Sequence, residues 1–153
     1  YFSKMVACKD WTGVRRTLKY YMQIIFIITV PLTGFFIVCS EPLVQILFQR
    51  GSFAASDTHL VAQIQAFYAL QIPFYVSTIF VVRLMESMLL NHILMWGSGL
   101  NLIANIGLNY LLMQWFGVAG IALSTSCVYV FSFLFLLICA NKKLKSTFTN
   151  LKS

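Results

Sequence analysis

Residues 20–39 read YYMQIIFIITVPLTGFFIVC, an apolar run that contains no Asp, Glu, Lys or Arg. Three further runs share this character, and they occupy residues 60–82, 93–115 and 118–140. A helix needs about 20 predominantly apolar residues to cross the hydrocarbon core of a bilayer, so each run is long enough to span a membrane. The sequence therefore predicts an all-α membrane protein, a polytopic bundle with four transmembrane spans.

The composition excludes a soluble globular domain. Hydrophobic residues make up 59% of the 153 residues and charged residues 10%, whereas a soluble domain carries about 25% charged residues. Buried helices of a soluble protein could account for one uncharged run, but not for four. The formal net charge of +7 would suit nucleic-acid binding, because basic patches bind phosphate backbones. Its distribution along the chain favours a membrane topology instead, and no nucleic-acid partner is expected.

The basic residues gather at the two ends of the chain. Of the 11 Lys and Arg residues, only Arg50 and Arg83 lie within the bundle at 20–140. Lys and Arg accumulate on the cytoplasmic side of membrane proteins. We therefore expect a cytoplasmic basic segment at 1–19 and a cytoplasmic basic tail at 141–153, disordered after its last lysine cluster. The even number of spans agrees with this topology, because it puts both ends on one side.

The connection between the first two spans, the external hairpin 41–59, is predicted to hold a short helix on the membrane surface. Glu41, Gln45 and Gln49 recur at every fourth position and form a single polar stripe beside apolar neighbours. Pro42 suits the first turn of such a helix. The apolar side would then lie in the lipid interface.

A turn fixed by Arg50, Gly51 and Asp57 is predicted to join this short helix to the second span. Gly51 ends the short helix, as glycine does at many helix C-termini. Ser56 or Asp57 can cap the helix that follows, and the negative charge of Asp57 suits the positive end of the helix dipole.

Two prolines lie inside predicted spans, Pro31 in the first and Pro73 in the second. Proline removes a backbone donor and clashes with the preceding turn, so we expect a kink at each. Thr29 and Thr33 could supply hydroxyls to the carbonyl that Pro31 leaves free. Each kink either shapes the bundle or acts as a hinge. The helical pattern of the second span continues to about Asn91.

The third span is the most polar, because Asn101, Asn105 and Asn109 stand at i, i+4 and i+8, with Ser98 three residues before them, so that all four fall on one helical face. Amides without partners are costly in hydrocarbon, so this face must meet another helix or a watery cavity. Both interpretations stay open: hydrogen bonds that join helices, or the lining of a cavity that takes a substrate.

Arg83 and Glu86 lie three residues apart near the inner end of the second span, where their side chains can face each other. Arg83 is the cation that a span could carry. It is either an interfacial anchor paired with Glu86 or a contact for an anionic group in the membrane.

No residue pattern indicates catalysis, a metal or a cofactor. The four cysteines form no Cys-x-x-Cys pair and no metal-ligand spacing with His59 or His92. The two histidines fall on opposite sides of the predicted membrane, so they cannot serve one active site. We expect a protein that is not an enzyme.

The hairpin carries the sequence pattern Glu41-Pro42, then Leu-Phe-Gln-Arg-Gly-Ser-Phe at 47–53, then Asp57-Thr58, followed by a span with Pro73 and by Arg83. This order resembles the C-terminal half of the MurJ/MviN family. Its members are lipid II flippases of bacterial cell-wall synthesis, within the multidrug/oligosaccharidyl-lipid/polysaccharide exporter superfamily. The motif residues that carry the resemblance are Arg50, Gly51, Phe53, Asp57, Thr58 and Pro73.

The resemblance implies a transporter of the cytoplasmic (inner) membrane that moves a lipid-linked glycan, lipid II in the first place, by alternating access. It implies as partners the lipid bilayer and the further helices of a longer protein, of which this chain, beginning with Tyr1 rather than Met, is a piece. The candidates for substrate binding or gating are Arg83, Glu86, Asn101 and Asn105.

Three alternatives to a lipid II flippase stay open. The residues after Arg83, Glu-Ser-Met-Leu-Leu-Asn-His at 86–92, depart from the family pattern, so a polysaccharide or O-antigen exporter is one alternative. A multidrug exporter of the same superfamily is another. The third is a small four-helix membrane subunit that transports nothing.

Overall fold

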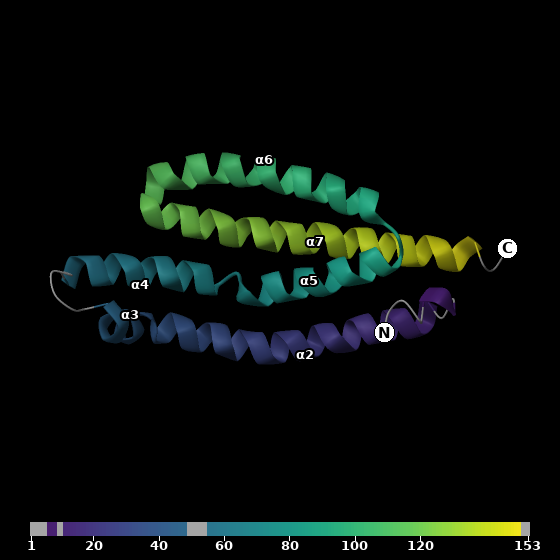
Figure 1. Ribbon diagram of the computed structural model, residues 1–153, viewed down its shortest axis with the longest axis horizontal. Helices are drawn as coiled ribbons and strands as arrows, with labels where there is room; N and C mark the ends of the chain where they lie inside the picture. The colour runs from purple at the N-terminus through teal and green to yellow at the C-terminus, as the bar shows by residue number, and fades with distance from the viewer. Residues whose placement is uncertain (1–5, 9–10, 49–54, 151–153) are drawn as a thin grey trace.

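The computed structural model describes residues 6–8, 11–48 and 55–150, and every regular element in these ranges is a helix. The prediction of an all-α fold is therefore confirmed. The elements are α2 (Trp11–Val38), α3 (Ser40–Phe48), α4 (Ala55–Ala69), α5 (Ile72–Ser87), α6 (Asn91–Phe116) and α7 (Val118–Asn150). They form an elongated bundle in which the start of α2 and the end of α7 lie at the same end (Figure 1).

Three stretches of the described chain are long and apolar enough to cross a membrane: Trp11–Val38, Asp57–Ser87 and Val118–Leu144. The second comprises α4 and α5 together. Helix α6 covers the remaining predicted span and carries no Asp, Glu, Lys or Arg, but its four asparagines lower its hydropathy. The sides on which the connections lie stay a prediction.

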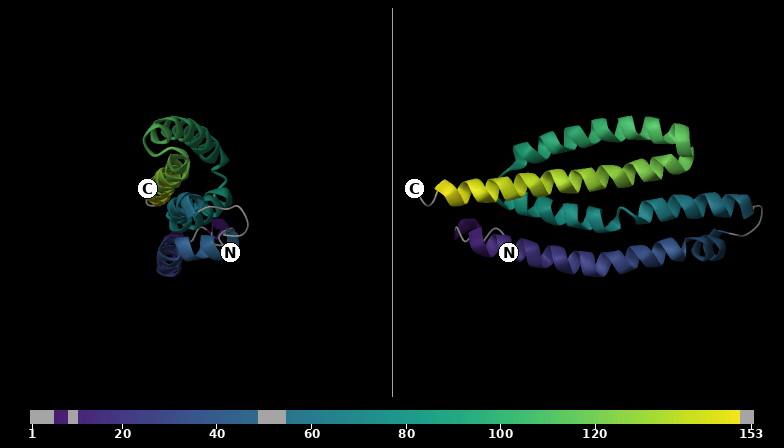
Figure 2. Two further views of the ribbon diagram at one scale, coloured as in Figure 1. Left: turned by 90° about the vertical axis from the view of Figure 1, so that its left-hand side faces the viewer. Right: turned by 180° about the vertical axis from the view of Figure 1, so that it is seen from behind.

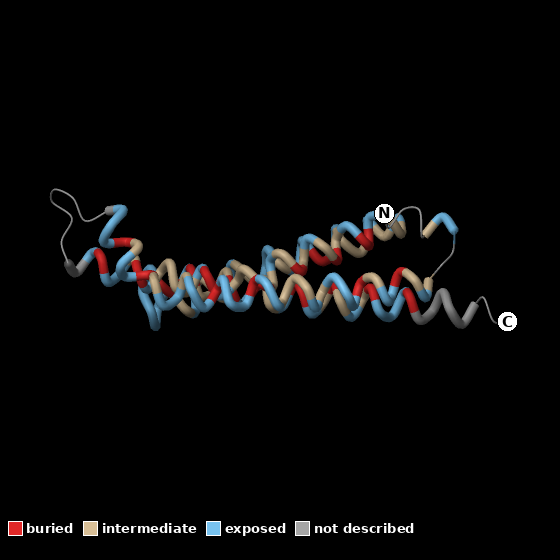
Figure 3. Tube along the Cα trace, turned by 90° about the horizontal axis from the view of Figure 1, so that it is seen from below, coloured by how far each residue is buried: buried red, intermediate tan, exposed pale blue. Residues whose placement is uncertain are grey.

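Helix α7 forms the centre of the bundle, where it packs against α6 on one side and against α4 and α5 on the other, while α2 packs against α4 and α5. Figure 2 shows the resulting order of layers across the bundle: α6, then α7, then α4 and α5, then α2. Buried residues recur along the helices where they face their neighbours (Figure 3). Many large apolar side chains face outward instead, as expected of helices whose outer surface meets lipid.

The main apolar core joins three helices near the end of the bundle where α2 starts. It comprises Val14 and Leu18 of α2, Val81, Leu84 and Met85 of α5, and Phe133, Leu136, Ala140 and Leu144 of α7. Helices in lipid associate mainly through close van der Waals packing. This cluster therefore holds α2, α5 and α7 together.

The turn between α6 and α7 depends on two glycines. Gly117 has φ +59° and ψ −139°, a backbone conformation that is essentially restricted to glycine. A β-carbon on Gly120 would lie 2.2 Å from the carbonyl oxygen of Leu112. The two helices therefore approach each other to backbone contact at this point, which the small residues at the start of α7 permit.

The two basic ends are helical over much of their length, which corrects part of the sequence analysis. Helix α2 begins at Trp11, so part of the basic segment 1–19 belongs to it. Helix α7 continues to Asn150, so the expected disorder is wrong for residues 146–150, while residues 151–153 lie outside the described residues. Each added residue gains a backbone hydrogen bond once a helix exists, and burial of Leu144, 1% exposed, supports the extension.

Helix α2 runs from Trp11 to Val38 and continues past Pro31 without a break. The Thr29 hydroxyl donates to the carbonyl of Ile25 at 2.7 Å, and not to that of residue 27, which Pro31 leaves free. The Thr33 hydroxyl is buried without a partner among the described residues. The prediction that these hydroxyls donate a hydrogen bond to the carbonyl left free by Pro31 is therefore wrong.

The second span is interrupted near Pro73, where α4 ends at Ala69 and α5 begins at Ile72. Pro73 stands in the first turn of α5, a position where its missing N–H costs no helical bond. The predicted kink is thus a short break. The helix also ends earlier than expected, at Ser87 instead of near Asn91, because Leu89 adopts a left-handed conformation with φ +57°.

The predicted short helix of the hairpin is present as α3. Glu41 lies in its first turn and stands 3.9 Å from His59 of α4, both side chains being exposed. Helix α4 begins at Ala55, and Asp57 lies in its first turn. Its negative charge still meets the positive end of the helix dipole.

Thr58 of the same turn is buried, with 3% of its surface exposed. The other motif residues of the hairpin, Arg50, Gly51 and Phe53, lie outside the described residues.

Candidate functional site

A polar groove opens between α5, α6 and α7. It encloses about 300 Å³, at the lower end of the range of small-ligand sites. Its polar lining residues are Thr78 and Glu86 of α5, Ser98 and Asn101 of α6, and Tyr129 and Ser132 of α7, and its apolar ones are Val82, Leu94, Gly97 and Leu136. Polar side chains from three apolar helices thus converge on one hollow.

Asn101 joins two walls of the polar groove. Its Nδ2 donates to Oγ of Ser132 at 2.8 Å, which ties α6 to α7. Gly97, one turn earlier on α6, is buried against the ring of Phe135, and an added β-carbon would lie 3.3 Å from that ring. The close approach of the helices therefore lets the amide reach its partner, and Asn101 both joins helices and lines a cavity.

Thr78 contributes a hydroxyl that the protein leaves unused. Its Oγ1 is buried and has no hydrogen-bond partner in the described part of the chain, although the residue lines the polar groove. A buried polar atom without a partner costs free energy. A polar group of a ligand, or a water molecule, in the groove would relieve this cost.

The other asparagines of α6 form a second polar contact, closer to the α6–α7 turn. Asn109 Nδ2 donates to Oδ1 of Asn105 at 2.7 Å, and the buried hydroxyl of Ser124 donates to Oδ1 of Asn109. Here the amides hold α6 against α7. Asn105 does not line the polar groove.

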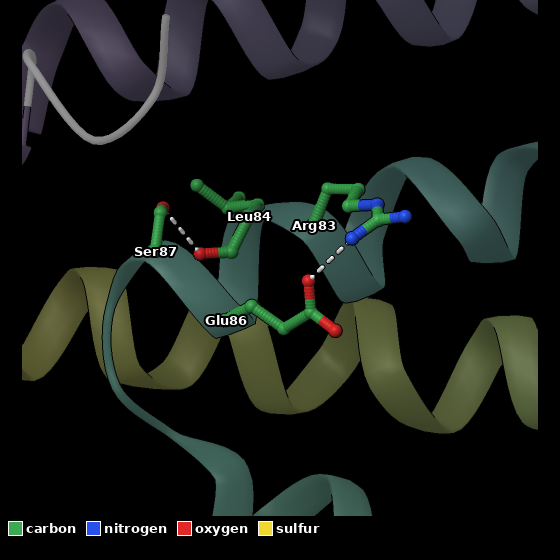
Figure 4. A network of polar contacts seen from close by, with 4 residues as sticks. All are labelled: Arg83, Leu84, Glu86 and Ser87. Carbon is green, nitrogen blue, oxygen red and sulfur yellow. Dashed lines mark hydrogen bonds and ion pairs between the residues drawn. The ribbon is translucent and has the colours of Figure 1, made fainter.

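Arg83 and Glu86 form an ion pair on the surface of α5, with Arg83 Nη1 3.1 Å from Glu86 Oε2 (Figure 4). The side chains are 72% and 44% exposed. An exposed pair of this kind contributes at most about 1 kcal/mol to stability, so a competing anion could separate it. Glu86 lines the polar groove, whereas Arg83 does not.

The structure thus brings Glu86 and Asn101 to one hollow and leaves Arg83 beside it and Asn105 further along α6. Sequence reasoning missed three polar lining residues: Thr78, Tyr129 and Ser132. Ser132 lies eight residues after Ser124, on the same face of α7. This recurrence of serine on one helical face is the sequence pattern that could have indicated Ser132. Neither Thr78 nor Tyr129 stands out from its apolar surroundings.

The remaining motif residues lie elsewhere. Asp57 and Thr58 are in the first turn of α4, and Pro73 is in the first turn of α5. Within the described ranges, no group of three or more His, Cys, Asp and Glu side chains could hold a metal ion. The chemistry that the polar groove offers is therefore hydrogen bonding beside one movable ion pair.

Comparison with known proteins gives concordant results. The family model described as lipid II flippase MurJ matches residues 1–152. The chain is 27% identical over 143 residues to the probable lipid II flippase MurJ of Synechocystis sp. (strain ATCC 27184 / PCC 6803 / Kazusa), which covers 94% of this chain and 27% of that protein. A solved structure of lipid II flippase MurJ in an inward closed conformation has the same fold, with a TM-score of 0.73 at 22% identity.

The solved structure is matched over 96% of this chain and 33% of its own chain. The chain therefore spans about a quarter to a third of the length of these relatives.

Proposed function

Because the chain belongs to the MurJ family, we propose that it is part of a transporter that moves lipid II across the cytoplasmic membrane. The observation that carries this proposal is the match of the family model over residues 1–152. The match favours lipid II over the cargo of a polysaccharide or multidrug exporter, and it gives no support to a non-transporting subunit. The helices of the chain would form one portion of the transporter, beside helices that the chain does not include.

Lipid II has an anionic pyrophosphate head group, which needs cationic partners inside a membrane. Arg83 is suited to this role because its side chain is 72% exposed and, among the described residues, its recorded partner is Glu86. A guanidinium binds phosphate oxygens through two parallel hydrogen bonds. In this proposal the pyrophosphate replaces Glu86 as the partner of Arg83 when the substrate arrives.

The polar groove would receive neutral parts of the head group. Asn101 and Ser132 offer hydrogen-bonding groups that are already oriented by their mutual contact, and Thr78 offers an unused hydroxyl. Asn105 supports this wall through Asn109. Transport then consists of binding and release at these groups, without a bond-breaking step, so the chain is proposed not to act as an enzyme.

Alternating access requires that groups of helices change their relative position. The break between α4 and α5 at Leu70 and Gln71 separates the part of the span that carries Arg83 from the part that begins at the hairpin. We place the flexing point of the span here. The alternative role of the Arg83–Glu86 ion pair is that of a gate, which closes the polar groove on its open side between transport cycles.

The test uses the full-length transporter in vesicles, with flipping of a fluorescent lipid II as the readout. We expect Arg83→Ala to lower the rate about ten- to a hundredfold, because a hydrogen bond to a charged group is worth about 1.5–3 kcal/mol. Arg83→Lys should keep part of the rate, since it retains the charge without the two-pronged donor set. Lys143→Ala, which removes an exposed cation that does not line the polar groove, is the matched control.

Glu86→Gln separates the two roles of the pair. If Arg83 binds the substrate, the loss of its competitor leaves the rate unchanged or raises it. If the pair is a gate, Glu86→Gln lowers the rate as Arg83→Ala does. An unaltered rate for Arg83→Ala at equal expression would reduce Arg83 to an interfacial anchor.

A further inference from the structure

A basic groove lies between the start of α2 and the last part of α7. These two helix segments lie at the same end of the bundle (Figures 1 and 2). The basic groove encloses about 780 Å³, within the range of about 300–1,000 Å³ found for ligand sites. Its lining residues are Thr12, Arg15, Arg16 and Lys19 of α2, and Asn141, Lys142 and Leu144 of α7. It shares no lining residue with the polar groove.

The charges of the basic groove are of one sign. Arg15, Arg16, Lys19 and Lys142 are exposed, and no carboxylate is among the lining residues that the structure describes. Within the described part of the chain, the recorded ion pairs involve other residues. Arg15 and Lys19 stand at i and i+4, where like charges repel. An anion in the groove would therefore relieve repulsion as well as gain attraction.

The walls next to these cations are apolar. An adjoining hollow of about 360 Å³ is lined by Leu18, Met22 and Leu137 together with Arg15, Lys19 and Asn141. Leu144, on the wall of the basic groove itself, is buried to 1% exposure. A fully water-soluble anion would gain nothing from contact with these apolar walls. A molecule with an anionic head and an apolar body fits both the cations and the apolar walls.

The groove also lies at the level of lipid head groups. The apolar run of α2 starts at Tyr20 and that of α7 ends at residue 140, so the lining cations stand just outside the hydrocarbon region on both helices. Tyr20 and Tyr21 line a neighbouring hollow with Arg16 and Lys19. Tyrosine is enriched at the membrane–water interface, which supports this depth.

From these observations we propose that the basic groove binds the phosphate head group of an anionic phospholipid from the surrounding leaflet. Basic pockets between membrane helices bind such head groups in general. Arg15 and Arg16 would hold the phosphate oxygens, Lys19 and Lys142 would complete the charge, and the glycerol and the first acyl carbons would lie along Leu18 and Met22. The lipid would thereby join the two ends of the chain.

The positive-inside rule also places cations at these helix ends, but it requires only charge and no particular pocket. A second source of phosphate is lipid II itself. The experiment has to distinguish bound phospholipid from a merely topological role of the charges and from bound lipid II. It therefore measures bound lipid directly and includes lipid II as a competitor.

Full-length transporter in mild detergent is mixed with phosphatidylglycerol or with phosphatidylcholine, and bound lipids are counted by native mass spectrometry. We expect retention of phosphatidylglycerol over phosphatidylcholine. Removing two cations with Arg16→Gln and Lys142→Gln should weaken phosphatidylglycerol binding about 25-fold, since each cation near an anionic lipid contributes about fivefold. Both side chains are exposed, so the folded structure should survive, which thermal unfolding checks.

Two further variants and one further lipid make the result decisive. Arg16→Lys keeps the charge and should retain most of the binding, and Lys143→Gln, which removes an exposed cation that does not line the basic groove, should retain all of it. Unchanged phosphatidylglycerol binding in the double variant would overturn the proposal. So would an equal loss in Lys143→Gln, or displacement of phosphatidylglycerol from the wild type by equimolar lipid II.

Discussion

Replacement of Gly120 by alanine tests how closely α6 and α7 approach at their turn. The added β-carbon would lie 2.2 Å from the carbonyl oxygen of Leu112, 2.5 Å from its carbonyl carbon and 2.9 Å from the backbone nitrogen of Met113. All three are backbone atoms of a helix, so no side chain can rotate away. The start of α7 must move from α6, or α6 must bend.

The expected cost follows from two opposing terms. Overpacking of a well-packed interior costs about 1–3 kcal/mol, and a contact with backbone atoms belongs at the upper end. Alanine recovers up to about 1 kcal/mol of helix propensity relative to glycine. The net destabilisation for Gly120→Ala is therefore about 2 kcal/mol. Gly107→Ala on α6, where nothing lies within 4 Å of the added carbon, should stabilise by up to about 1 kcal/mol.

The assay is thermal unfolding of the purified full-length transporter, followed by the loss of monodisperse protein in size-exclusion chromatography. Gly120→Ala should have a lower midpoint than the wild type, and Gly107→Ala an equal or higher one. A shared midpoint for Gly120→Ala and the wild type would refute the close packing at the turn. A fall in both variants alike would show that glycine itself, and not the approach of the helices, matters.

Two other predictions follow from the same structure. Asn101→Ala should lower the stability of the folded transporter by about 1 kcal/mol. Because hydrogen bonds between membrane helices average about 0.6 kcal/mol, the effects of Asn101→Ala and Ser132→Ala should be non-additive in a double-mutant cycle. Additive effects would mean that the hydrogen bond contributes nothing to stability. The charge distribution of the sequence predicts that single cysteines at Ser52 and Ser146, in a background without the native cysteines, label from opposite sides with an impermeant thiol reagent. Labelling of both from outside intact cells would contradict this topology.

The apolar runs predicted the helices well, because the length and lack of charge of such a run leave few other structures in a membrane. The ends of the helices were harder to predict. The cluster around Lys142 predicts where α7 leaves the lipid, but it does not end the helix. The end of α5 depends on a left-handed Leu89, a conformation that leucine rarely adopts and that no local pattern announces.

The site was predicted where it depends on spacing within one helix. Arg83 and Glu86 at i and i+3 do form an ion pair. The partner of Asn101 was not predictable, because Ser132 lies 31 residues away and meets it only in the register that α6 adopts on α7. The functional roles of these residues stay predictions.

The amides of α6 also bear on how the protein enters its membrane during synthesis. Helix α6 leaves the ribosome before α7, yet Asn101 and Asn109 find hydrogen-bond partners on α7, at Ser132 and Ser124. An isolated α6 would carry unsatisfied amides into hydrocarbon. The two helices should therefore be released into the lipid as a pair, so that truncation before Val118 leaves α6 poorly inserted in a glycosylation-mapping assay, while a truncation after Leu144 restores it.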